Sequence, residues 1–186
     1  NIMRKLLLSV AIIAAFSTTS FAQEAKNPFE GAYAGGMIGV NSYSFDDLDE
    51  NISGVTYGGL LGYRAEVSNG VLLGMEGYVQ GNQANKDFVV SGITANVSSD
   101  ASYGLNATLG FGSEKALLFV VAGWGWNGVS VSALDQSASE SDNGIHAGIG
   151  GEFVLSETIN LRVQGDWQDF DGASSIGGSA GIVFKF

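Results

Sequence analysis

The chain has 186 residues, about the size of one domain, with 28 glycines, one proline and no cysteine. The absence of cysteine excludes disulfide and thiolate–metal chemistry. The formal net charge is −11, and no basic cluster is available to neutralise phosphates, so we expect no nucleic-acid partner.

Residues 1–22 predict a signal peptide for export. Arg4 and Lys5 follow Met3, a mostly apolar run covers residues 6–16, and small residues flank Phe21 near the expected cleavage site. The apolar run is well short of the roughly 20 residues that a membrane-spanning helix needs. We therefore expect that Met3 is the start residue, with Asn1 and Ile2 upstream of it. Cleavage is expected after residue 22, which leaves a mature domain at residues 23–186. Loss of Arg4 and Lys5 would change the charge from −11 to −13.

Alternation of apolar and polar residues predicts eight β-strands. In the longest stretch, residues 93–111, the odd positions are nearly all apolar or aromatic, and the even positions are only Thr, Asn, Ser, Asp and Gly. This period of two favours a strand with two different faces over a helix. The expected strands are, in order, residues 32–44, 55–67, 73–80, 93–111, 118–126, 145–153, 161–167 and 176–186.

The connections between these stretches alternate in length. Short turns are expected near Asn69, Glu114 and Ser156, and longer polar loops at residues 45–53, 82–92, 132–143 and 169–175. An even number of strands, with tight turns at one end and longer loops at the other, predicts an all-β fold. Specifically, it predicts an eight-stranded antiparallel up-and-down transmembrane β-barrel.

A soluble ligand-carrying barrel would also alternate, so the positions of the aromatic residues decide which face meets lipid. Counted from the short turns, they fall at two levels roughly 20 Å apart along the barrel axis, as two aromatic girdles at the membrane interfaces would. The expected girdle residues are Tyr57, Tyr63, Tyr103, Phe111, Trp124, Trp126, Phe153 and Trp167.

Charged residues on the opposite, inward face predict a salt-bridge layer inside the barrel. Glu152 and Arg162 flank the turn near Ser156, so they are expected to face each other across that hairpin. Arg64 and Glu76 flank Asn69 in the same way, and Glu66 lies on the same face. Buried charges cost several kcal/mol each unless they are paired. On packing grounds the layer is expected to be a static polar core that fills the lumen.

Signals for catalysis or metal binding are poor. The single histidine, His146, is followed by Ala147 and Gly148, and the chain has no cysteine. The carboxylates Asp135, Glu140 and Asp142 lie in a serine-rich loop with nothing to fix their separation. The acidic run Asp46, Asp47, Asp49 and Glu50 lacks the glycine of a calcium-binding loop. We therefore expect no enzyme activity, no metal and no cofactor.

Several short motifs carry a family resemblance: Gly31–Gly36, Gly74–Glu76, Gly151–Phe153, Asn160–Arg162 and the terminal Phe186. Through them the chain resembles the small eight-stranded outer-membrane barrels of Gram-negative bacteria, of the OmpA/OmpX type and the opacity type. The resemblance implies that Phe184 and Phe186 form the signal read by the barrel-assembly machinery. It also implies a lumenal plug or gate, although Thr108 stands where a further basic residue would align.

The resulting hypothesis is an integral protein of the cell outer membrane with a structural or surface-interaction role. It would contact outer-membrane lipid and lipopolysaccharide and display acidic loops, as a surface antigen does, to an extracellular ligand that the sequence does not identify. The alternative is a narrow porin-like channel for small solutes or ions, since many inward glycines could leave water-filled gaps in the lumen.

Overall fold

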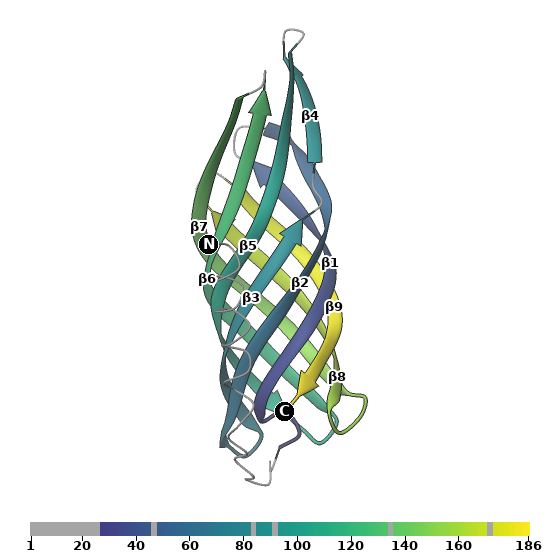
Figure 1. The fold of residues 1–186 in the computed structure, drawn as a ribbon. Helices are drawn as coiled ribbons and strands as arrows, with labels where there is room; N and C mark the ends of the chain where they lie inside the picture. Colours follow the sequence, from purple (N-terminus) through teal and green to yellow (C-terminus); the bar gives the residue numbers. More distant parts are fainter. Residues whose placement is uncertain (1–26, 46–47, 83–84, 91–92, 134–135, 171–172) are drawn as a thin grey trace, which may run out of the picture.

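The computed structural model describes residues 27–45, 48–82, 85–90, 93–133, 136–170 and 173–186. The expected signal peptide therefore lies outside the described residues. The strands are β1 Gly31–Phe45, β2 Leu48–Ser68, β3 Val71–Asn82, β4 Asn85–Val90, β5 Ile93–Gly112, β6 Ala116–Ala133, β7 Gln136–Val154, β8 Ile159–Phe170 and β9 Ala173–Lys185 (Figure 1). Within these ranges no helix is long and apolar enough to cross a membrane.

All paired strands are antiparallel and form one closed barrel. Strands that are neighbours in sequence pair with each other, except for β3 and β4. In addition, β1 pairs with β9, and the pairing of β3 with β5 closes the wall. Because β3 and β4 pair with successive parts of β5, they lie in line and occupy one position in the wall. The barrel is therefore eight-stranded, which confirms the predicted fold class.

The two ends of the barrel differ. At one end, here called the turn end, β2–β3, β5–β6 and β7–β8 are joined at residues 69–70, 113–115 and 155–158, as the sequence predicts. Gly70 has a φ of 78°, a conformation that glycine adopts without steric cost and that a tight turn requires. At the other, the hairpin end, only two residues separate β1 from β2, β4 from β5, β6 from β7 and β8 from β9.

The expectation of long loops at the hairpin end is wrong. Residues 85–90 form β4, and β2 and β7 begin at Leu48 and Gln136. In Figure 1, β4 and the ends of β5, β6 and β7 rise above the cylinder as extended hairpins. Residues 48–53, 85–90 and 136–143 lack a long apolar face, so the sequence predicts loops there, but the backbone still pairs, for example Phe88 with Ala95.

Many large apolar side chains point outward, and the lumen is filled by polar and aromatic side chains together with a small aliphatic core of Leu72, Leu117 and Val121. Ile38, Met75 and Ile149 are each more than 60% exposed, whereas Arg162 and Glu152 are fully buried. This arrangement inverts that of a soluble protein. It suits a barrel whose outer surface contacts hydrocarbon.

Two of the inward glycines face large aromatic rings, which occupy space that the channel alternative would need to be filled by water. A Cβ atom added at Gly62 would lie 2.4 Å from the Tyr33 ring, and one added at Gly150 would lie 2.4 Å from the Phe119 ring. Tyr33 and Phe119 are both buried. The glycines therefore make room for large rings that fill the lumen.

Ile149→Arg tests the lipid-facing assignment, since Ile149 lies between the two aromatic levels and is 67% exposed. A cationic side chain near the bilayer midplane is expected to lower the free energy of unfolding by about 2–4 kcal/mol. Urea unfolding in lipid vesicles measures this change. The control Leu155→Arg, in an exposed turn, should stay within about 0.5 kcal/mol. Equal effects of the two changes would refute a lipid-facing position for Ile149.

Candidate functional site in the barrel lumen

Four charged side chains meet across the lumen and form the ion-pair cluster: Arg64 of β2, Glu76 of β3, Glu152 of β7 and Arg162 of β8. Arg64 forms a bidentate pair with Glu152, at 2.7 and 3.1 Å. Arg162 forms a second bidentate pair with Glu76, at 2.5 and 3.1 Å, and lies 3.5 Å from Glu152. All four side chains are at most 3% exposed. Both guanidinium groups are therefore matched by carboxylates in a site from which water is largely excluded.

The partners differ in part from those that hairpin spacing suggests. Glu152 and Arg162 are directly opposite in the ladder, as predicted. Arg64 is opposite Gly74 and is diagonal to Glu76, but its guanidinium bonds Glu152 across the lumen instead. The reason is that inward side chains of a narrow barrel reach across its axis as easily as along the wall.

Glu66 does not join the cluster, so its predicted place there is wrong. Its carboxylate accepts a 2.7 Å hydrogen bond from the Gly70 amide at the β2–β3 turn. The side chain lies at the turn end of the barrel and is only partly buried. Glu66 stabilises the tight turn. Of the two charged residues Arg64 and Glu66 on the inward face of β2, only Arg64 therefore belongs to the ion-pair cluster.

Two aromatic rings enclose the guanidinium groups. The Tyr33 ring lies 4.1 Å from the Arg64 guanidinium carbon, and the Tyr33 hydroxyl donates a 3.0 Å hydrogen bond to Glu76. The Phe119 ring lies 4.5 Å from Arg162 and 5.5 Å from Arg64. These cation–π contacts stabilise the two guanidinium groups in place of the water that would otherwise solvate them. The sequence places both rings on inward faces, but nothing in it marks them as partners of the arginines.

Below the cluster, residues 27–30 fold into the turn end of the lumen and form the N-terminal plug. Phe29 is 2% exposed and packs in a core of Leu72, Leu117, Phe119 and Val121. Lys185 donates a 2.6 Å hydrogen bond to the Pro28 carbonyl and fixes the plug to the last strand. Gly112 leaves the space that the plug needs, because a Cβ there would lie 3.1 Å from Asn27 Oδ1 and 3.2 Å from the Phe29 ring.

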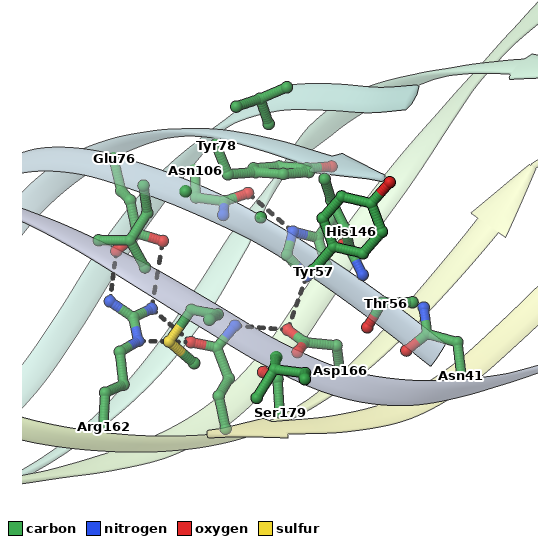
Figure 2. Close-up of a pocket in the computed structure, with 18 of the residues that line it drawn as sticks. Asn41, Thr56, Tyr57, Glu76, Tyr78, Asn106, His146, Arg162, Asp166 and Ser179 are labelled. Atoms are coloured by element: carbon green, nitrogen blue, oxygen red, sulfur yellow. Dashed lines mark hydrogen bonds and ion pairs between the residues drawn. The ribbon is translucent and has the colours of Figure 1, made fainter. Parts of the chain in front are cut away.

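Above the cluster, a second polar layer continues toward the hairpin end (Figure 2). Arg162 donates to Gln164 at 2.9 Å, and the Gln164 amide donates to Asp166 at 2.5 Å. His146 contacts Asp166 through Nε2 at 2.8 Å and Asn106 through Nδ1 at 2.9 Å. The Tyr78 ring packs edge-on against His146, with centroids 5.3 Å apart. One chain of hydrogen bonds thus joins the ion-pair cluster to His146.

A cavity of about 60 Å³ lies beside this layer. Asp166, Gln164, Gln168, Thr56, Asn41 and Ser179 are among the residues that line it. The space suits a few water molecules or a small ion and is much smaller than a pocket for an organic ligand.

The remaining predicted site residues lie on the outer surface. Seven of the girdle residues are 44–63% exposed: Tyr57, Tyr63, Tyr103, Phe111, Trp124, Phe153 and Trp167. Trp126 is less exposed, because its ring stacks on Tyr103 with centroids 5.6 Å apart. Phe184 and Phe186 also face outward. Thr108 is buried on the inward face of β5, opposite Gly74, so no further cation joins the cluster from that position.

A family described as outer membrane protein β-barrel domain matches residues 8–182. Among solved structures, the attachment invasion locus protein Ail of Yersinia pestis is 18% identical, with a TM-score of 0.60 over 84% of this chain and 99% of that one. Ail in complex with the heparin analogue sucrose octasulfate gives 20% identity and a TM-score of 0.59, over the same shares of the two chains. Neisserial surface protein A is 16% identical, with a TM-score of 0.62 over 84% of this chain and 98% of that one.

A comparison with curated proteins finds no match. At these low identities the solved structures establish a shared fold, and roles of individual residues must come from this chain itself.

Glu152→Gln tests the ion-pair cluster, since Glu152 contacts both arginines. The change leaves Arg64 without its carboxylate in a buried site, so the free energy of unfolding is expected to fall by about 3–5 kcal/mol. Urea unfolding in lipid vesicles is again the measurement. Glu157→Gln, in an exposed turn, serves as the control with little effect expected. A loss below about 1 kcal/mol for Glu152→Gln would contradict a water-excluded ion pair.

Proposed function

Because this chain belongs to the outer membrane protein β-barrel family, it is an integral barrel of the outer membrane, and we propose that it acts there as a closed surface-interaction protein. Its lumen is filled, and its acidic hairpins face outward toward a cationic partner. The observation that carries the proposal is the length of the strands at the hairpin end.

Four strands are much longer than a bilayer requires. β2, β5, β6 and β7 contain 21, 20, 18 and 19 residues, whereas a tilted transmembrane strand needs about 9–11. The turns at the other end are short, so the excess length lies at the hairpin end. In outer-membrane barrels short turns face the periplasm and longer connections face outside. The extended hairpins are therefore well placed to meet molecules outside the cell.

The charge at the hairpin end is one-sided. Residues 45–53, 82–101, 128–143 and 169–175 contain four, two, three and two acidic residues respectively, eleven of the nineteen in the chain. The same segments contain a single basic residue, Lys86. A negative field of this kind attracts cationic peptides or basic protein surfaces and repels polyanions. The complex of Ail with a heparin analogue is thus a poor guide to the ligand of this chain.

The filled lumen argues against the channel alternative. The N-terminal plug, the ion-pair cluster and the rings of Tyr33 and Phe119 are stacked along the barrel interior. Eight-stranded barrels are usually just wide enough to be filled by side chains. Permeation would require displacement of both the plug and the cluster, so we favour a closed barrel.

A non-enzymatic role agrees with the position of His146. Both of its ring nitrogens are engaged by Asn106 and Asp166 inside the lumen, away from the lipid that a membrane-lipid enzyme must reach. We further propose that Phe184 and Phe186 are read by the barrel-assembly machinery and that the aromatic girdles contact lipid and lipopolysaccharide.

Binding of a fluorescent ten-lysine peptide to the protein in nanodiscs without lipopolysaccharide tests the outward charge. Neutralising Asp46, Asp47, Asp49 and Glu50 together, as Asn and Gln, is expected to weaken binding several-fold at low salt. Binding should vanish at about 1 M salt, where the Debye length is about 3 Å. Fluorescent heparin should not bind at all.

The matched control neutralises Glu114 and Glu157, which are exposed at the turn end. A loss as large in this control as in the hairpin variant, or preferential binding of heparin, would reject the proposed display of acidic hairpins. Heat-modifiable migration on a gel shows that each variant is folded.

Planar-bilayer conductance tests whether the barrel is closed. Wild type is expected to show no stepwise conductance. Phe29→Ala alone should show no conductance, because the ion-pair cluster still blocks the lumen. Glu76→Ala alone should show none either, because the N-terminal plug remains. Only the double variant is expected to conduct. Conductance steps from folded wild-type protein would favour the channel alternative.

A further inference from the structure

The partly buried carboxylate of Asp166 differs from the fully buried carboxylates of Glu76 and Glu152. Glu152 and Glu76 are each paired with an arginine at 2.7 and 2.5 Å. Within the described part of the chain, the ion pair of Asp166 is with His146, which is charged only when protonated. The lumen at this level therefore has one negative charge that no arginine or lysine balances, and an unbalanced charge is costly in a poorly solvated interior.

The hydrogen bonds of Asp166 leave part of its carboxylate available. Its Oδ1 atom accepts from both His146 Nε2 and Gln164 Nε2. The Oδ2 atom accepts no hydrogen bond from the described residues, and the side chain is 17% exposed. Since Asp166 lines the cavity of about 60 Å³, an occupant of that cavity can lie beside this carboxylate.

The lining of the cavity is mixed: besides Asp166 it includes the ion-paired Arg162 and Glu76, apolar residues, and neutral side chains that carry oxygen atoms. The neutral residues with amide or hydroxyl groups include Asn41, Thr56, Gln80, Gln168 and Ser179. Figure 2 labels Asn41, Thr56 and Ser179 among the residues around the cavity. Carboxylate, amide and hydroxyl oxygens are the ligands that hard, non-transition cations prefer. No cysteine is present, and the one imidazole is already bonded at both nitrogens.

From this arrangement we propose that the cavity is a binding site for a monovalent alkali cation, held by Asp166 and the neutral oxygens around it. One unbalanced carboxylate matches a single positive charge. Calcium or magnesium sites usually recruit more than one carboxylate. The volume accepts a small ion with one or two waters and excludes organic cations. The site is independent of the surface partner proposed above, because it lies inside the barrel.

Crystals of the protein grown at pH 8 in rubidium chloride test the proposal, with Rb⁺ as the probe. An anomalous peak beside Asp166 is expected in wild type, absent in Asp166→Asn and retained in Glu157→Gln. No peak in wild type, or an equal peak in Asp166→Asn, would overturn the assignment.

Two solution measurements separate this proposal from the alternative in which protonated His146 supplies the missing charge. The melting temperature of wild type should be higher in rubidium chloride than in choline chloride of equal ionic strength, and Asp166→Asn should lose that difference. ¹⁵N NMR of the His146 ring should show a neutral imidazole in rubidium chloride at pH 8. An imidazolium spectrum would show that a proton on His146 balances the charge of Asp166. Equal melting temperatures of wild type in the two salts would show that the cavity binds no alkali cation. Either result would overturn the proposal.

Discussion

The closed barrel depends on the pairing of charges inside it. Arg64, Glu76, Glu152 and Arg162 come from four different strands, and each carries a full charge into a space with little water. Such charges are tolerated only when every one of them meets its partner at close range. The cluster therefore disfavours alternative strand registers, because a slip of one residue would turn an arginine or a glutamate toward lipid.

The outer surface and the lumen are formed by the two opposite faces of the same strands. Lipid accepts the apolar face, and the glycines of the other face admit rings such as Tyr33 and Phe119. The rings in turn cover the guanidinium groups, and the plug covers the rings from below. A small lumen filled in this way supports the wall of the barrel from within.

Much of this fold can be predicted from the sequence, because alternation shows which residues share a face of a strand and the positions of the aromatic residues indicate which face meets lipid. The eight strand positions, the three tight turns and the Glu152–Arg162 register are all encoded in local spacing. The Arg64–Glu152 pair is not, since it depends on how far side chains reach across the closed barrel. The hairpin strands escaped prediction for a related reason: outside the bilayer neither face needs to be apolar, so the alternation fades although the backbone still pairs.

The contact between Lys185 and Pro28, together with the pairing of β1 with β9, brings the first and last described strands side by side. The final seam of the wall thus joins residues separated by nearly the whole chain. Until the C-terminal strand has been synthesised and exported, both margins of the growing sheet carry unsatisfied amides and carbonyls, which invite intermolecular pairing. The unfinished chain is therefore prone to intermolecular pairing along both edges, and a chain that ended before β9 would keep these edges unpaired.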